Sequence, residues 1–367
     1  MNKYKTLEDI RMAKALLSPP GDTLSDTIES YHLTQADLAA RMGRPVKTVN
    51  EIIKGKTVIT PETAIQLERI LKIQASFWLN RETDYQIQLA EISEAEKFLE
   101  QEDWINKFPL NEMKRNGWID FENNSLSKME SLLSFLGISN IEGFERVYGQ
   151  KSHECCYRAD QRGNHTNNAI AVWLRRGEIQ AEEMKVKAYS SALFKDSLLK
   201  IKSILANQPA DFFNQIQSLC AEAGVKLVHT PCLKDVSMHG STHWVNENPV
   251  IQLSNRYKRN DIFWFTFFHE AGHILKHGKR ALFIEGLEPI KSEKEAEADE
   301  VAIEYTLSKR QEVELMRNLP LNNESILMFA KKFNTHPACI IGRFARKYPN
   351  LNKMGWSLGY FLKIDIP

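Results

Sequence analysis

An HExxH sequence inside an apolar stretch constrains this chain more than any other feature. The run FFHEAGHILKHG, residues 267–278, places His269 and His273 four residues apart, with Glu270 next to the first. On a helix, residues four apart share a face, so both imidazole rings can reach one metal ion. Glu270 can then take a proton from an attacking water instead of binding the metal. Chance would place the motif in such a chain about 0.03 times. The sequence therefore predicts a helix that carries a zinc hydrolase centre.

A third protein ligand is needed, because two histidines leave a catalytic zinc site incomplete. The segment SEKEAEADEVAIEY, residues 292–305, has no Pro or Gly, and we expect a second helix there. Glu295 and Asp299 share a face of that helix, so the first can bind zinc while the second accepts an N–H from a ligating histidine. Glu293 and Glu297 offer the same spacing, and a solvated acidic face would also explain the run. Periodicity alone leaves the third ligand open.

A helix-turn-helix pattern occupies the N-terminal part of the chain. The run LTQADLAARMGRPVKTVNEIIKG, residues 33–55, has apolar residues at helical spacing broken at Gly43, which predicts two short helices and a turn. Thr34 and Asp37 form a short capping-box signature for the first helix. We expect the second helix to present polar side chains to the major groove, with neighbouring side chains on phosphates. The predicted DNA contacts are Gln35, Arg44, Lys47, Thr48, Asn50 and Lys54, with Lys56 beside them. A helical hairpin with a solvated basic edge is the alternative.

Strands are expected just before the HExxH helix. The run NPVIQL, residues 248–253, has the β-branched character of a strand, and residues 225–244 are expected to contribute further strands to a peptidase sheet. An exposed edge strand beside a zinc site could hold an extended peptide substrate by strand addition. Tyr257 and His243 are candidate contacts to the substrate or to a transition-state oxyanion.

Three other histidine positions have weaker interpretations. His277 follows His273 by four residues, but a fourth protein ligand would close the zinc site. We therefore expect it to interact with the last carbonyls of its own helix. His239 and His243 are also four apart, which makes a second metal conceivable on one face of a strand. Surface polar residues are the simpler interpretation of this pair.

Composition is that of a soluble globular protein, with 43% hydrophobic and 26% charged residues. A length of 367 residues predicts two or three domains. The net charge is +1, so any affinity for DNA must come from a local basic surface. Five cysteines without a CxxC pair favour a reduced cytosol over a disulfide framework. We expect a cytoplasmic protein, because no secretory segment and no apolar run of roughly 18 residues appears.

The segment from about residue 225 to 310 resembles the ImmA/IrrE metallopeptidases. The family pattern FTxxHExGHxLxH is matched by FTFFHEAGHILKH at 265–277, and ExxADxFA is matched by EAEADEVA at 295–302. The resemblance implies that one catalytic zinc is held by His269, His273 and Glu295, with Glu270 as the base and Asp299 orienting a histidine. It also implies a zincin-like fold and a substrate that is a helix-turn-helix repressor. Val301 stands where the family usually has Phe, which bears on packing downstream of the zinc ligands.

Residues 20–86 resemble the HigA-type antitoxins, which are helix-turn-helix proteins of the XRE class. The likeness includes the TQADLAARMG, ITPETA and FWLN segments. It implies a five-helix, lambda-repressor-like domain that binds operator DNA as a homodimer, with a toxin as a possible partner. Nothing in this chain encodes such a toxin.

These patterns predict an α+β, mostly helical chain in three parts. A HigA-like DNA-binding domain is expected at 1–90, a helical connector at 91–210, and a zincin-like metallopeptidase domain with a small sheet at 211–367. The predicted function is a DNA-binding regulator with a zinc-dependent endopeptidase, which cleaves a repressor-type protein or itself to control transcription. The alternative is an antitoxin or transcription factor whose metallopeptidase-like domain senses a signal or binds a partner without proteolysis.

Overall fold

The structure, a computed structural model, describes residues 3–149, 165–234, 238–254, 256, 259–278, 283–285, 293–345 and 348–364. Tyr257 lies outside the described residues, as do Cys155 and Cys156. The chain forms two compact units, one made of 1–106 with 120–132 and the other of 107–119 with 133–367. The domain boundaries expected near residues 90 and 210 stay predictions.

The first unit is helical in the described residues. Its helices are α1 (Leu7–Leu16), α2 (Pro20–Ser30), α3 (Gln35–Met42), α4 (Val46–Ile53), α5 (Pro61–Leu71), α6 (Ala75–Glu100), α7 (Glu102–Ile105) and the first part of α9 (Ser125–Leu136). Helices α2 to α5 and the first turn of α6 share one apolar core, which includes Leu38, Val49, Leu67 and Trp78. The predicted group of five helices therefore packs as one body.

The turn between α3 and α4 follows directly from its sequence. Thr34 caps α3, and its side chain and that of Asp37 complete a capping box. Gly43 ends the helix in the left-handed conformation, with φ of 65°, a conformation that glycine adopts without steric cost. Pro45 then precedes α4, where its fixed φ suits the residue before a helix. The predicted two helices and Gly turn are confirmed.

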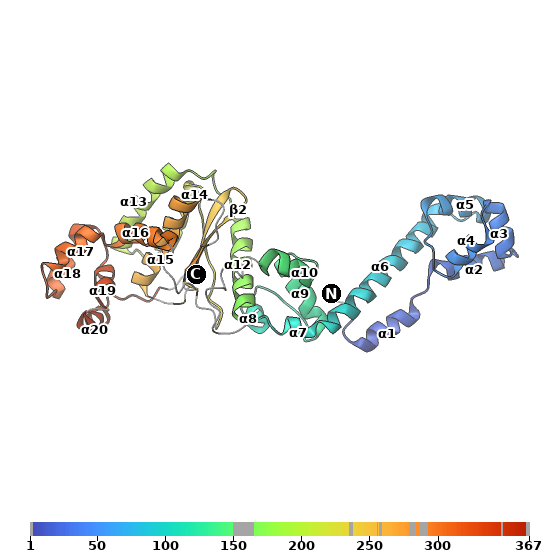
Figure 1. Cartoon of the computed structure of the whole chain (residues 1–367), viewed down its shortest axis with the longest axis horizontal. Coiled ribbons are helices and arrows are strands. Elements are labelled where there is room, and N and C mark those ends of the chain that lie inside the picture. Colours follow the sequence, from blue (N-terminus) through green and yellow to red (C-terminus); the bar gives the residue numbers. More distant parts are fainter. Residues whose placement is uncertain are drawn as a thin grey trace. The chain divides into compact units, whose positions relative to one another are not determined.

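The second unit surrounds a small sheet with helices (Figure 1). Its helices are α8 (Leu110–Arg115), the end of α9, α10 (Ile141–Phe144), the π-helix η1 (Glu145–Gly149), α12 (His165–Glu183), α13 (Ser191–Asn207), α14 (Phe212–Glu222), α15 (Asn260–His277), α16 (Glu293–Thr306), α17 (Lys309–Met316), α18 (Asn323–Phe333), α19 (Pro337–Ala345) and α20 (Pro349–Ser357). The strands are β1 (Lys226–His229), β2 (Gly240–Val245), β3 (Asn248–Leu253) and β4 (Phe283–Glu285).

The sheet has the order β1-β3-β2-β4. Strand β3 pairs parallel to β1 and antiparallel to β2, and β4 closes the other edge antiparallel to β2. The predicted strand at 248–253 is confirmed with the same boundaries. Strands β1 and β2 lie within 225–245, where further strands were expected.

Helices α12 and α15 cover opposite faces of this sheet. Thr242 of β2 hydrogen-bonds to Glu270 of α15, whereas the adjacent Ser241 is paired with Gln252, whose side chain donates to the Trp173 carbonyl of α12. Successive side chains of a strand point to opposite faces, so these contacts separate the two layers. The α15 side is the larger core, built from apolar residues of α13, α14, β1, β3 and α15.

Helices α17 to α20 pack around a separate apolar core, which includes Leu315, Phe329, Ile340 and Leu351. Cys220 and Cys339 are buried thiols outside any disulfide, and the Cys232 thiol donates to the Leu233 carbonyl oxygen. None of the helices in the described ranges combines the length and apolar character that crossing a bilayer requires. The described residues are therefore mostly helical with a small sheet, as predicted, while the zincin-like assignment of the C-terminal part stays a prediction.

Candidate functional site

Helix α15 carries the HExxH sequence through the middle of the second unit. Almost every residue from Phe263 to Ile274 is buried, because one face packs on the sheet and the other on α16. The helix begins at Asn260, and Asp261 in its first turn pairs with Arg259 at 2.9 and 2.7 Å. A buried helix presents its polar side chains only where a partner or a ligand compensates their burial.

A glycine allows α16 to approach this helix closely. A Cβ on Gly272 would lie 2.9 Å from Ala298 Cα and 3.0 Å from the Ala298 carbonyl oxygen. Any larger residue would force the two helices apart. Gly272 is one of the two variable positions of HExxH, and its role in this close packing was not predicted from the sequence.

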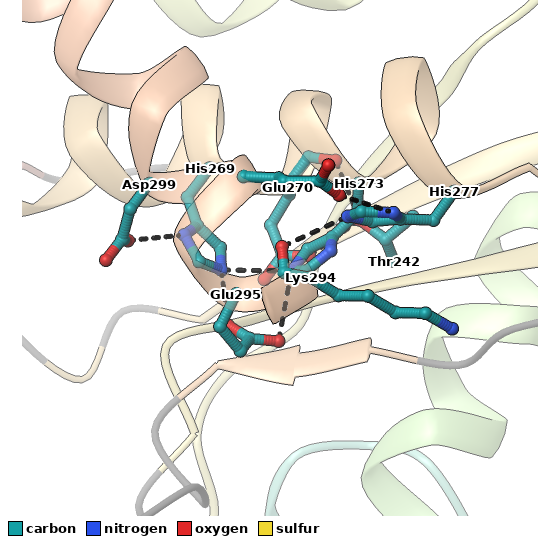
Figure 2. Close-up of polar contacts among 9 residues, drawn as sticks. Thr242, His269, Glu270, His273, His277, Lys294, Glu295 and Asp299 are labelled. Carbon is teal, nitrogen blue, oxygen red and sulfur yellow. Dashed lines mark hydrogen bonds and ion pairs between the residues drawn. The ribbon is translucent and has the colours of Figure 1, made fainter. Parts of the chain in front are cut away.

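Three side chains converge between α15 and α16 (Figure 2). His269 Nε2 and His273 Nε2 are 3.0 Å apart. Glu295 places Oε2 at 3.1 Å from His269 Nε2 and Oε1 at 3.4 Å from His273 Nε2. The two histidines are 3% and 1% exposed, so this polar group is almost fully removed from solvent. Of the carboxylates described on α16, Glu295 is the one that groups with both histidines, and its role as a zinc ligand stays a prediction.

The protonation states of these side chains suit metal binding. Burial by itself raises the pKa of Glu295, but hydrogen bonds from His269 and His273 outweigh it and lower that pKa to about 2. Burial lowers the pKa of His273 below its usual value. At neutral pH the site thus offers an ionised carboxylate and a neutral imidazole, and a metal ion would take the place of the Nε2 protons that face Glu295.

Asp299 fixes the orientation of the first histidine. Its Oδ1 atom lies 3.0 Å from His269 Nδ1, on the opposite side of the ring from Glu295. When Nδ1 carries the proton and donates it to Asp299, the lone pair of Nε2 is directed at the other two ligand atoms. Asp299 therefore lies within hydrogen-bond distance of the ring that it was expected to orient, and the orienting role stays a prediction.

The donor set fits a zinc ion. The ligand atoms of His269, His273 and Glu295 all lie within 4.8 Å of one another. Tetrahedral ligands at 2.0 to 2.1 Å from zinc lie roughly 3.3 Å apart, close to the spacings of 3.0, 3.1 and 3.4 Å. Two histidines and one glutamate, with a fourth position left for water, form a ligand set of catalytic zinc sites.

Glu270 lies against β2, in a contact that the sequence did not predict. It is fully buried, and the Thr242 hydroxyl lies 2.6 Å from its Oε2 atom and 3.0 Å from its carbonyl oxygen. The pairing of a strand residue with a helix residue 28 positions away leaves no local signal in the sequence. The alternation of Gly240, Thr242 and Trp244 along β2 could only have suggested that these three share a face.

The remaining histidine predictions have different outcomes. His277 was expected at the last carbonyls of its own helix, and the structure places it against α16: its Nε2 atom lies 3.0 Å from the carbonyl oxygen of Lys294, and Nδ1 lies 3.5 Å from Glu297. His243 follows Thr242 on β2, so its side chain points to the other face of the sheet, away from Glu270. Neither His239 nor His243 belongs to the metal-ligand group found among the described residues.

Helix α4 carries Lys47, Thr48 and Asn50 of the predicted DNA-contacting residues. Lys47 is 84% exposed, and its 3.8 Å ion pair with Glu51 is too solvated to hold it. The Asn50 side chain donates a hydrogen bond to Gln35 Oε1 at 3.0 Å, which links α4 to the start of α3. Lys54 is exposed at the end of α4, and Thr48 is half-buried. These side chains form one polar surface on the two helices.

Arg44 is engaged within the domain. Its guanidinium donates to the Thr63 hydroxyl at 3.1 Å and pairs with Glu62 at 3.2 Å, both at the start of α5. A phosphate contact by Arg44 would therefore compete with these bonds. These partners were not predicted from the sequence, because Glu62 and Thr63 lie 18 and 19 positions away from Arg44.

Comparisons with known proteins concern this N-terminal region. Residues 27–78 match the Helix-turn-helix family model HTH_3. The HTH-type transcriptional regulator YddM of Escherichia coli (strain K12) is 26% identical over 72 residues, which cover 20% of this chain and 77% of YddM.

Two solved structures also share 26% sequence identity with the chain and cover 23% of it. One is assigned as an antidote protein of a plasmid maintenance system from Nostoc punctiforme, of which 91% is covered, with a TM-score of 0.22. The other is an addiction module antidote protein of the HigA family from Coxiella burnetii, of which 94% is covered, with a TM-score of 0.21. The family match at residues 27–78 spans the end of α2, all of α3, α4 and α5, and the start of α6, and it identifies this part of the chain as a helix-turn-helix domain.

Proposed function

We propose that this protein is a DNA-binding transcriptional regulator whose second unit is a zinc-dependent endopeptidase. The observation that supports the enzyme is the convergence of His269, His273 and Glu295, with Glu270 one residue from the first ligand. Burial of two histidines and an ionised glutamate costs free energy, and a metal ion bound between them would compensate that cost. The resemblance to the ImmA/IrrE metallopeptidases names the same residues.

Each side chain has a separate role in this proposal. His269, His273 and Glu295 hold the zinc, and Asp299 keeps the His269 ring in the binding tautomer. Zinc in such a site supplies a Lewis acid for a peptide carbonyl. Glu270 accepts the proton of the attacking water and delivers it to the nitrogen of the leaving amine, so the peptide bond breaks with no net proton uptake by the residue.

The helix-turn-helix domain suggests what such a cut would control. A DNA-binding domain would bring an endopeptidase joined to it to the operators that the domain binds, and the ImmA/IrrE resemblance implies a helix-turn-helix repressor as the substrate. Because this chain contains such a domain, the substrate is either a separate repressor or another copy of the chain. Cleavage would release transcription at the bound operator. The homodimer and the toxin partner stay predictions.

Metal analysis tests the first half of the proposal. The purified full-length protein should contain about one zinc per chain, and His269→Ala and Glu295→Ala should each abolish it, since two ligands rarely retain zinc. Glu293→Ala serves as the matched control on the same helix, because Glu293 is exposed and outside the ligand group. Zinc in all four proteins, or in none, would refute the metal centre.

A cleavage assay tests the second half. The zinc-loaded protein is incubated with purified repressors encoded near its own gene and with itself, and fragments are identified by mass spectrometry. Cleavage that stops with a zinc chelator supports the endopeptidase. Zinc binding and DNA binding without any cleavage would favour the alternative, in which the second unit is a sensor or a partner-binding module.

A further inference from the structure

The side chain of Glu270 rests in a cradle formed by one face of β2. The Thr242 hydroxyl lies 2.6 Å from Glu270 Oε2. Both side chains are buried, with Thr242 1% exposed and Glu270 fully covered. The contact joins the sheet to the helix that carries the proposed metal ligands, so it can control where the carboxylate stands relative to them.

The hydroxyl proton goes to the carboxylate. Thr242 has one O–H proton and two acceptors within reach, Oε2 at 2.6 Å and the Glu270 carbonyl oxygen at 3.0 Å. A separation of 2.5 to 2.7 Å is typical of an O–H bound to an ionised oxygen. The shorter contact is therefore the stronger of the two hydrogen bonds, and it holds Oε2 toward the sheet.

Gly240 leaves room for the rest of the carboxylate. It lies two residues before Thr242, on the same face of β2. A Cβ at this position would lie 2.8 Å from Glu270 Oε1 and 3.0 Å from Glu270 Cγ. Gly240 therefore leaves space for the Glu270 carboxylate, and the Thr242 hydroxyl holds the carboxylate in that space.

We infer that Thr242 is a positioning residue for Glu270: its hydroxyl fixes the rotamer in which the carboxylate can serve as the general base. This inference rests on the proposed function for its catalytic consequence, but the hydrogen bond exists with or without turnover. A general base must stand within hydrogen-bond reach of the proton that it removes, so loss of the rotamer lowers the rate of the chemical step.

Three variants of β2 test the role of the hydroxyl in the zinc-loaded full chain. Thr242→Val keeps the shape of the side chain and removes the donor, and Thr242→Ser keeps the donor and removes the methyl group. Ser241→Ala is the matched control, because Ser241 is buried on the opposite face of the same strand.

Kinetics are measured on a repressor protein that the wild type cleaves, together with zinc content. Thr242→Val should lower kcat about 10- to 100-fold with KM and zinc content unchanged, since it impairs the base and neither substrate binding nor the metal. Thr242→Ser should recover kcat to within about threefold of wild type, and Ser241→Ala should match the wild type. An unchanged kcat in Thr242→Val, a Ser variant as slow as the Val variant, or loss of zinc from the Val variant would each overturn the inference.

Crystal structures of the same variants provide a test that does not depend on activity. Glu270 should leave its place against β2 in Thr242→Val and keep the short contact in Thr242→Ser. If the wild type cleaves no protein, the proposed endopeptidase fails while this structural comparison still decides whether Thr242 positions Glu270. An unmoved Glu270 side chain in Thr242→Val would overturn the inference even in an active enzyme.

Discussion

Asp299 Oδ1 lies 3.0 Å from His269 Nδ1, so a carboxylate on α16 determines the direction in which a ring on α15 faces. The Nε2 atom of the same ring meets Glu295 at 3.1 Å. One helix therefore supplies both a proposed zinc ligand and the group that orients another. This double role makes the packing of α15 on α16 part of the metal site.

Removal of Asp299 should weaken zinc binding without abolishing it. Groups that hold a ligating histidine in place typically change metal affinity by about 10- to 100-fold. We expect a loss of this size in Asp299→Ala, measured by competition with a zinc-binding dye. Glu300→Ala is the control, because Glu300 is paired on the surface with Lys309. Equal affinities in the two variants would show that Asp299 does not act through His269.

An added methyl group at Gly272 should disturb both packing and metal binding. In Gly272→Ala the new Cβ meets the Ala298 backbone at 2.9 Å, and backbone atoms cannot move aside as a flexible side chain can. Overpacking of this kind costs roughly 1 to 3 kcal/mol, partly offset by about 1 kcal/mol from the better helix propensity of alanine. Thermal unfolding and zinc affinity should both decline, while Lys276→Ala, at an exposed position of the same helix, should leave them unchanged. Wild-type stability and affinity in Gly272→Ala would contradict the close-packing account.

Acid should destabilise the second unit partly through His336. Burial lowers the pKa of this histidine to about 4, and its Nδ1 atom accepts a hydrogen bond from the Ala338 amide at the start of α19. The unfolded chain binds the proton near pH 6.5 and the folded chain only near pH 4, so stability is lost as pH falls between these values.

His336→Asn removes this titration and keeps an acceptor for the Ala338 amide. Calorimetric unfolding should show the variant gaining stability relative to wild type as pH decreases from about 6.5 to about 4, with a constant difference above that window. Parallel stability curves for the two proteins through the window would show that His336 is not the responsible group.

The surface formed by α3 and α4 should account for DNA binding. Lys47→Ala combined with Asn50→Ala removes an exposed cation and the amide that bonds to Gln35. We expect affinity for a duplex selected by the wild type from random DNA to fall about 10-fold or more at fixed salt, since a base contact is worth about 1 to 3 kcal/mol. Zinc content should not change. Lys97→Ala, an exposed position near the end of α6, is the control; if it weakens binding as much as the double variant, α4 is not the recognition helix.

Local patterns in the sequence predicted much of the fold. Thr34 and Gly43 are local signals for the start and end of α3, and both act as expected in the structure. The β-branched run at 248–253 also predicted β3, and the run without Pro or Gly at 292–305 predicted α16. These elements depend on residues within a few positions of one another, which periodicity and capping describe well.

Contacts between distant segments could not be predicted in the same way. Helical spacing made Glu293 and Glu295 equally good candidates for the third ligand. The packing of α16 on α15 brings Glu295 to the two histidines and leaves Glu293 outside the ligand group. Thr242 was missed because its partner lies on another element, and Arg44 was expected on DNA because Glu62 and Thr63 were not visible as its neighbours. Such pairings depend on tertiary packing, which the pattern of a single sequence does not predict.

The most direct test of the account compares the wild type with Glu270→Gln in one cleavage assay. Both proteins are loaded with zinc, the metal is quantified, and cleavage of neighbouring repressors and of the chain itself is followed by mass spectrometry. The account predicts about one zinc per chain in both proteins and fragments with the wild type alone, because glutamine cannot accept the proton. Equal cleavage by Glu270→Gln, or no fragment from any repressor with the zinc-loaded wild type, would contradict it.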